Sequence, residues 1–247
     1  SEDPVRMLRV VRFAAKLGFS IEESSQAAIS KCRHLLADIP AARLFDETLK
    51  LFMAGFAAPT IEHLAKYELL ELLFPETLSA MNDPSSRGLI LTAMANTDAR
   101  VARGKPVTPA FLLGALLWPA VTARGRDIAS AGTHEGSPIN AAGQIVITNT
   151  LQRVSIPKRF SIPMREIWEL QSRLEKCSPK RVRSILSQRR FRAAFDLLLL
   201  RSESSDELKS TVTFWEEQQL LFPDVVGSLP AAEIPKRKRQ PHRRKRN

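Results

Sequence analysis

Cysteine is scarce in this sequence. Cys32 and Cys177 are the only two in 247 residues, and two cysteines this far apart make neither a metal-ligand spacing nor a disulfide framework. A reducing compartment suits such a chain, so we expect a cytoplasmic protein. The four histidines are scattered and complete no Ser/His/Asp or Cys/His pattern, which leaves hydrolase functions without support.

Long hydrophobic runs are also missing. The two most apolar stretches, 112–118 and 197–200, are much shorter than the roughly 20 residues that a transmembrane helix needs. The first residues show no signal-peptide pattern, so we expect no membrane span. They open inside a helix-start motif without an initiator methionine, and we therefore expect a fragment of a longer protein.

Acidic residues are outnumbered by basic ones. The chain has 37 lysines and arginines against 26 aspartates and glutamates, which gives a net charge of +11 at pH 7 and an isoelectric point near 10.2. Such an excess favours an anionic partner, either nucleic acid or a membrane surface. Many of the positive charges lie in one run near the end of the chain: Lys236, Arg237, Lys238, Arg239, Arg243, Arg244, Lys245 and Arg246.

The segment that contains this run, 223–247, has too few large apolar residues to order itself. We expect a disordered basic tail that binds phosphate backbone without sequence preference. A nuclear-import signal and a merely solubilising tail are the alternatives.

The remaining sequence has the pattern of an all-α protein. Its hydrophobic content of 44% is sufficient for a sizeable core, and its apolar residues recur at helical spacing rather than in alternation. Only 145–147 resembles a strand. Caps and periodicity predict helices at 20–36, 40–55, 60–74, 85–103, 109–118, 124–131, 138–155 and 205–221.

The most informative stretch lies at the start of the chain. Asp3 is a good N-cap, Pro4 suits the first helical position, and Gly18 suits a left-handed C-cap. The predicted apolar face of this helix consists of Val10, Phe13, Ala14 and Leu17. A different stripe carries cations: Arg6, Arg9, Arg12 and Lys16. Because like charges at this spacing repel, we expect an anionic ligand to compensate them.

The run from Glu2 to Arg9, followed by Arg12-Phe13-Ala14, resembles the neck-helix motif of the class II nucleotidyltransferases. That family contains bacterial poly(A) polymerases and CCA-adding tRNA nucleotidyltransferases. The resemblance implies that Asp3 and Arg6 read the base of the incoming nucleotide, since a carboxylate accepts from an exocyclic amine and a guanidinium donates to ring acceptors. Arg9 and Arg12 would support that site or the phosphates. The alternative is a plain cap with a solvated cationic face.

A second motif of this family resembles residues 43–50. There an arginine and a glutamate one turn apart brace the neck against the nucleotide site, and Arg43 and Glu47 stand at that spacing. We expect the two side chains to pair. An ordinary surface ion pair is the alternative reading.

Between residues 157 and 192 the charge becomes strongly basic. Three stretches here, 156–159, 165–171 and 191–198, look like the C-terminal body of bacterial poly(A) polymerases. With gaps, the resemblance runs from Glu2 to about Glu217 and favours a poly(A) polymerase over the tRNA enzyme. Besides the tail, the residues expected to contact RNA are Lys158, Arg159, Arg165, Lys180, Arg181 and Arg183.

Three aromatic residues interleave with these cations. Phe160, Trp168 and Phe191 either pack in a core or stack on bases. A core position is favoured for Trp168, because Ile167 and Leu170 flank it on the predicted helix.

The sequence lacks the parts that nucleotidyl transfer needs. Two divalent metals are held by clustered carboxylates, commonly a D-x-D pair, and no D-x-D occurs here. In the family these carboxylates lie in a head domain that precedes the neck. The resemblance thus implies a parent enzyme that uses Mg²⁺ and ATP to add AMP to RNA 3′ ends. This chain would supply base recognition and RNA binding, with no catalytic residue or metal ligand, and would be inactive alone.

These expectations combine into an elongated all-α molecule. We expect neck helices over 1–80, a helical RNA-binding body over 81–222 and the basic tail over 223–247. A CCA-adding enzyme is the alternative within the family. A non-catalytic helical RNA-binding module is the alternative from another class.

Overall fold

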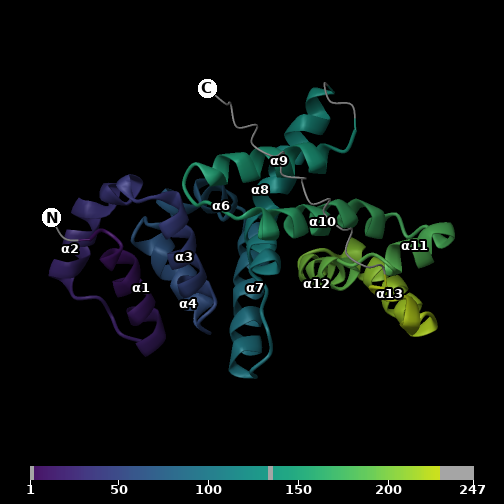
Figure 1. The fold of residues 1–247 in the computed structure, drawn as a ribbon, viewed down its shortest axis with the longest axis horizontal. Helices are drawn as coiled ribbons and strands as arrows, with labels where there is room; N and C mark the ends of the chain where they lie inside the picture. Colours follow the sequence, from purple (N-terminus) through teal and green to yellow (C-terminus); the bar gives the residue numbers. More distant parts are fainter. Residues whose placement is uncertain (1–2, 133–135, 229–247) are drawn as a thin grey trace, which may run out of the picture.

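The computed structural model describes residues 3–132 and 136–228. Over these ranges the chain forms thirteen α-helices and three short 3-10 helices, with no strand (Figure 1). The prediction of an all-α fold is therefore confirmed, and the stretch 145–147 lies inside a helix. None of the helices in the described ranges is both long and apolar enough to cross a bilayer.

The helices follow one another through short connections. The first half of the chain contains α1 (Arg6–Leu17), α2 (Glu23–Cys32), η1 (Arg33–Asp38), α3 (Ala41–Phe52), α4 (Ala57–Lys66), α5 (Leu70–Leu73), α6 (Pro75–Ala80) and α7 (Pro84–Ala102). The second half contains α8 (Pro109–Ala131), α9 (Pro138–Leu151), α10 (Lys158–Glu175), η2 (Pro179–Arg181), α11 (Val182–Leu186), α12 (Phe191–Ser202), α13 (Asp206–Leu221) and η3 (Pro223–Val225).

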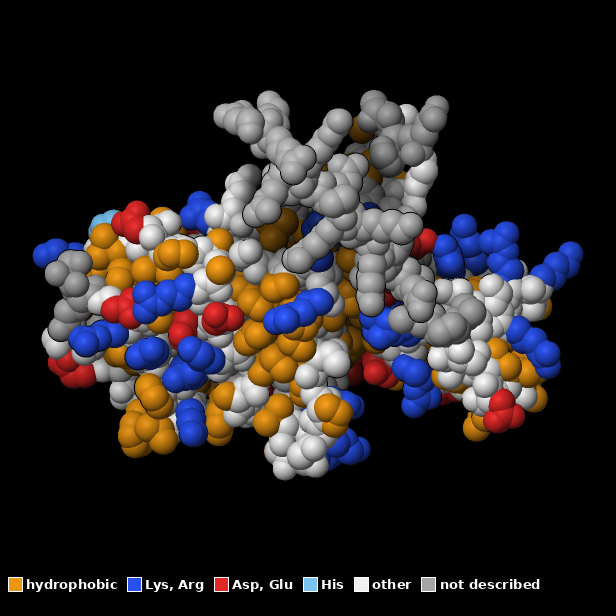
Figure 2. All heavy atoms as spheres, viewed as in Figure 1, with side chains coloured by type: hydrophobic (Ala, Val, Ile, Leu, Met, Phe, Trp, Pro, Cys, Tyr) orange, Lys and Arg blue, Asp and Glu red, His pale blue; other side chains and the backbone are white. Residues whose placement is uncertain are grey.

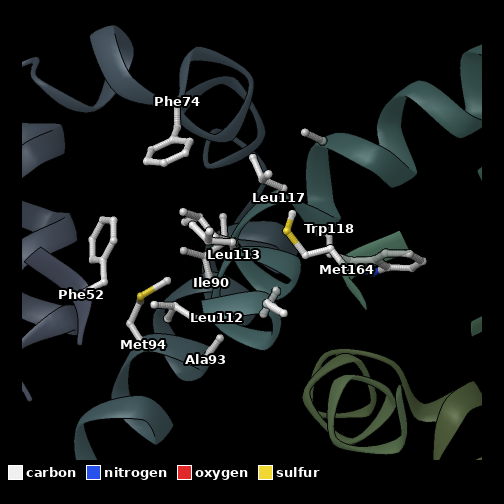
Figure 3. Close-up of a cluster of buried hydrophobic side chains, with 14 of the residues drawn as sticks. Phe52, Phe74, Ile90, Ala93, Met94, Leu112, Leu113, Leu117, Trp118 and Met164 are labelled. Carbon is white, nitrogen blue, oxygen red and sulfur yellow. The ribbon is translucent and has the colours of Figure 1, made fainter. Parts of the chain in front are cut away.

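The helices are distributed along the long axis of the molecule. Figure 1 shows α1 to α4 at one end, α7 and α8 in the middle, and α11 to α13 at the other end. One continuous hydrophobic core joins them, from Met7 to Trp215. In the close-up of its centre, Phe52 and Phe74 lie around Ile90 of α7 and Leu113 of α8 (Figure 3). The N-terminal helices are thus packed onto the central pair.

The central helix α8 is longer than the sequence predicted. The expected helices 109–118 and 124–131 are one helix that continues through Pro119. A proline inside a helix lacks one amide and costs about 3 kcal/mol. Burial of almost every residue from Ala110 to Val121 compensates for this cost.

Trp168 organises the contact of α10 with α8 and α9. Its ring is 1% exposed, and its Nε1 donates to the Gly114 carbonyl oxygen at 2.9 Å. A Cβ atom on Gly143 of α9 would lie 3.0 Å from Cε3 of the indole. Gly143 therefore makes room for the indole between the helices. The prediction that Trp168 is a core residue is confirmed.

The beginning of the predicted tail is ordered. Residues 223–225 form η3, and the Gly227 amide donates to the Leu186 carbonyl oxygen at 2.8 Å. The chain thus remains attached to α11 beyond the residue where we expected disorder to begin. The rest of the predicted tail, 229–247, lies outside the described residues, and so do its eight predicted RNA contacts.

Candidate nucleotide and RNA-binding site

Asp3 lies just before the N-terminus of α1 and accepts hydrogen bonds from the residues that lead into the helix. Its Oδ1 accepts a hydrogen bond from the Val5 amide at 3.2 Å, and its carbonyl oxygen accepts from the Arg6 amide at 3.0 Å. Pro4 and Val5 form a tight turn, so the regular α-helix begins at Arg6. The prediction of Asp3 as the N-cap is therefore wrong: Asp3 stabilises the turn before the helix, while Val5 is the N-cap and the helix begins two residues later than predicted.

The carboxylate of Asp3 also reaches a second helix. Arg43 of α3 donates from Nη2 to Asp3 Oδ2. Desolvation opposes ionisation of Asp3, but the Val5 amide and the guanidinium groups of Arg43 and Arg9 outweigh it, so the pKa of Asp3 lies below its ordinary value. Asp3 is therefore a carboxylate at neutral pH and is held from two sides.

The predicted pairing of Arg43 with Glu47 is wrong. Glu47 is 5% exposed and accepts from Lys50 Nζ at 2.7 Å, whereas the ion pair of Arg43 is with Asp3. The sequence motif identified the right arginine but not its partner. Forty residues separate Asp3 from Arg43, and no local pattern connects them.

The predicted apolar face of α1 is also wrong. The helix buries Met7, Leu8, Val11, Ala14 and Ala15, and it packs on α3 and α4. The stripe that we expected to be buried is exposed, apart from Ala14: Val10 is 38%, Phe13 50% and Leu17 53% exposed. Apolar and basic side chains lie side by side at this end of the molecule in Figure 2.

Arg6 shares the exposed face of α1 with these apolar residues. Spacings of four, three and four residues place Arg6, Val10, Phe13 and Leu17 on one side of a helix. Arg6 and Arg9 are exposed, and the half-buried Arg12 has its guanidinium carbon 5.1 Å from the centre of the Phe13 ring. The candidate base-reading groups thus border an apolar surface.

The basic segment begins beside α3, where the Ser155 amide donates to the Ala41 carbonyl oxygen at 3.0 Å, so Lys158 and Arg159 lie near the N-terminal helices. From there it extends along α10 to the far end of the molecule. Figure 2 shows Lys and Arg side chains gathered there, around the position of α11 in Figure 1. All six described candidates for RNA contact are exposed. They are Lys158, Arg159 and Arg165 on α10, Lys180 and Arg181 in η2, and Arg183 on α11.

The acidic residues of this segment are neutralised by other arginines. Glu166 pairs with Arg190 at 2.9 Å, Glu169 with Arg173, and Glu175 with Arg201 at 2.6 Å. None of the six candidates forms an ion pair with a residue in the described part of the chain. Their charge therefore remains available to an anionic ligand.

Two of the three aromatic residues in this segment cannot stack on bases. Trp168 and Phe191 are at most 1% exposed. Phe160 is half-buried, with its ring centre 5.8 Å from that of Phe45 and 4.8 Å from the Arg159 guanidinium carbon. This surface therefore offers an anionic ligand positive charge rather than aromatic rings for stacking.

Two protein-family models match the chain. Residues 18–81 match a family described as "Probable RNA and SrmB-binding site of polymerase A", and residues 131–247 match "Polymerase A arginine-rich C-terminus". Poly(A) polymerase I of Escherichia coli O157:H7 is 37% identical over 254 residues, which cover 98% of the chain and 55% of the relative. The chain belongs to the bacterial poly(A) polymerase family.

A further poly(A) polymerase and a CCA-adding enzyme match over shorter ranges. Poly(A) polymerase I of Haemophilus influenzae is 37% identical over 226 residues, which cover 88% of the chain and 49% of that enzyme. The CCA-adding enzyme of Latilactobacillus sakei is 30% identical over 195 residues, 70% of the chain and 47% of the enzyme. The chain thus spans about half the length of these relatives.

Some of the candidate residues lie within the two matched regions and others lie before them. Arg43 and Glu47 lie in the first matched region, and the basic residues of α10, η2 and α11 lie in the second. Asp3 and Arg6 precede both regions.

Proposed function

We propose that this chain forms the base-recognition and RNA-binding part of a cytoplasmic poly(A) polymerase. The parent enzyme adds AMP from ATP to RNA 3′ ends without a template. The observation that carries the proposal is the ionised Asp3 carboxylate, held beside Arg6 at the start of α1 in a chain that matches bacterial poly(A) polymerases almost throughout.

In this proposal Asp3 and Arg6 read the adenine of ATP. A carboxylate offers about four acceptor positions, and the contacts with Val5 and Arg43 use two of those on Asp3. One of the others accepts from the exocyclic amine of adenine, while Arg6 donates to a ring nitrogen. Arg43 acts as a positioning residue because it fixes the carboxylate that makes the contact. Arg9 and Arg12 support the site or the phosphates.

We propose that a catalytic head domain docks on the exposed side of α1. An apolar stripe of Val10, Phe13 and Leu17 is an unusual surface to leave in water, and the relatives contain about as much chain again outside the match. Mg²⁺ does not fit the described residues, since they offer no group of three or more His, Cys, Asp or Glu side chains for a metal. We therefore assign the metal to the head domain.

RNA then runs over the basic surface that extends from the start of α10, beside α3, to α11. The six exposed cations of α10, η2 and α11 contact the phosphates, and the lysines and arginines of the terminal run extend the contact. This binding carries no sequence information of its own. The incoming nucleotide is chosen at α1.

The experiment that tests the proposal uses the purified chain with labelled RNA, Mg²⁺ and either ATP or CTP. We expect the RNA to bind at low salt and to show no 3′ extension. Extension with ATP by this chain alone would contradict the assignment of catalysis to the head domain, because it would require catalytic carboxylates within the chain. Failure to bind RNA would contradict the binding role.

A CCA-adding enzyme is the second candidate, favoured by the match to the Latilactobacillus sakei enzyme. The two candidates differ in the intact protein. A polymerase that joins this chain to its head should extend RNA with ATP and not with CTP. Equal use of both nucleotides would support the tRNA enzyme instead.

A further inference from the structure

The exposed cations of the body form two separate groups. The proximal group, in the first half of α10, consists of Lys158, Arg159 and Arg165. The distal group, in η2 and α11, consists of Lys180, Arg181 and Arg183. In the stretch between them, Glu166, Glu169 and Glu175 are each paired with an arginine. Two patches of unpaired positive charge are therefore separated by a stretch in which acidic and basic side chains neutralise each other.

The proximal group lies beside the helix that fixes Asp3. Just before α10 begins, the Ser155 amide donates to the Ala41 carbonyl oxygen of α3 at 3.0 Å. One turn into the contact, the ring centres of Phe160 and Phe45 are 5.8 Å apart. The same helix α3 carries the arginine that donates to the Asp3 carboxylate. The start of α10 and the proposed base-reading site therefore share α3 as a common neighbour.

The distal group lies beyond the other end of α10. This helix has 18 residues, so at 1.5 Å per residue it spans about 27 Å. Figure 1 shows it extending from the side of α3 toward α11. A strand with stacked bases advances about 3.4 Å per nucleotide, so about eight nucleotides are needed to follow α10 from one group to the other.

The chemistry of the proposed function fixes where the 3′ end of the RNA must lie. AMP is added to the 3′ oxygen of the RNA while the base of the incoming ATP is read at the start of α1. Because reacting atoms must approach to about 3–3.5 Å, the 3′ end lies next to that nucleotide. Of the two groups of cations, the proximal one is therefore the nearer to the 3′ end.

We propose that RNA lies on the body in one direction, with the nucleotides near its 3′ end at the proximal group and upstream nucleotides at the distal group. The proposal rests on the proposed function, which places the incoming nucleotide at α1. The two groups then distinguish RNAs by length. A short RNA reaches the proximal group alone, whereas an RNA about eight nucleotides longer reaches both. The enzyme thus holds an RNA more tightly once added adenylates have lengthened it past α10.

The test measures AMP addition by the polymerase that joins this chain to its head domain. Adenine RNAs of about four, eight, twelve and sixteen nucleotides cover the usual range of single-strand site sizes. The proximal variant combines Lys158→Gln with Arg159→Gln, and the distal variant combines Lys180→Gln with Arg181→Gln. Each variant removes two exposed charges, so each is the matched control for the other. The measured quantity is kcat/KM for the RNA at each length.

We expect the proximal variant to lower kcat/KM about fivefold at every length, the size expected for two exposed charge pairs. The distal variant should lower kcat/KM equally for the longest RNA and leave the shortest RNA unchanged. Equal effects of the distal variant on the shortest and longest RNAs would overturn the proposal. A proximal variant that is impaired only on the longest RNA would mean that RNA lies in the opposite direction.

A second measurement reads the direction without catalysis. The longest RNA carries one 4-thiouridine near either its 3′ end or its 5′ end and is crosslinked to the same polymerase by ultraviolet light without ATP. Mass spectrometry should find the 3′ probe on α3 or the start of α10 and the 5′ probe on η2 or α11. Reversed positions, or the same position for both probes, would overturn the proposal. A polymerase that extends no RNA with ATP would contradict the proposed function alone, because the crosslinks still report the direction.

Discussion

The carboxylate of Asp3 combines a structural role with the proposed recognition role. The Val5 amide and Arg43 fix it in space, and they keep it ionised because both favour the charged form. A carboxylate held from two helices keeps its free lone pairs in a constant direction. Such fixed geometry is what discrimination between bases requires, since a mobile acceptor would accommodate several bases equally.

Arg6 is expected to determine nucleotide choice rather than RNA affinity. In the intact polymerase, Arg6→Ala should lower the kcat/KM ratio for ATP over CTP about tenfold, because it removes one base contact, and should leave the RNA Kd within about twofold. Steady-state extension assays and anisotropy measure the two quantities. Lys16→Ala removes an equal charge from the same helix and is the control. Equal losses for ATP and CTP would contradict the assignment.

At the level of whole elements, α1 shows what periodicity can and cannot predict. Eight of its twelve residues are apolar, so two apolar stripes run along the helix. The sequence predicts an amphipathic helix but not which stripe the neighbours cover. The stripe with Ala14 and Ala15 is buried, since small side chains permit close approach to α3 and α4. The bulky Phe13 and Leu17 remain outside.

Other elements differ from prediction for similar reasons. Pro119 predicts a helix break, yet the burial of α8 on all sides outweighs one lost hydrogen bond. The segment 60–74 divides into α4 and α5, with Glu68 at a positive φ of 57° between them. Most helices were therefore predictable, but α6, which begins at the Pro75 expected to end a helix, and α12 were not among those predicted. Helix continuity depended on tertiary burial.

The junction of α8, α9 and α10 depends on Trp168. Trp168→Ala should lower the free energy of unfolding by about 3–5 kcal/mol, because it leaves a cavity and an unpaired Gly114 carbonyl oxygen. Ile162→Ala on the same helix, at a side chain 43% exposed, should cost less than about 1 kcal/mol. Urea denaturation measures both. Equal effects of the two variants would mean that the junction is less tightly packed than the structure indicates.

At the scale of the whole molecule, the proposed RNA surface extends from the N-terminal helices to the opposite end. The proposed base-reading residues stand at the start of α1, and the basic surface begins beside α3 at Lys158 and continues along α10 to α11 (Figure 1). The sequence predicted both sets of residues, because charge and motif are local properties. It did not predict the bond between Asp3 and Arg43, since that bond joins residues that are distant along the chain.

The arrangement of charge on the body leads to a last prediction. Lys158, Arg159 and Arg165 have no ion pair among the described residues, whereas Arg173, Arg190 and Lys209 each pair with an acidic side chain. Both sets carry the same total charge, but only unpaired cations release counterions from RNA directly.

Replacing the first set by glutamine should therefore reduce the slope of log Kd against log salt by about 2, at roughly 0.7 per phosphate contact on single strands. The same change in the second set should leave the slope nearly unchanged, although the net charge falls equally. Anisotropy titrations between 50 and 200 mM salt, roughly the range over which such contacts respond, measure both slopes. Equal reductions would mean that RNA responds to the overall charge of the molecule and not to a defined surface on α10.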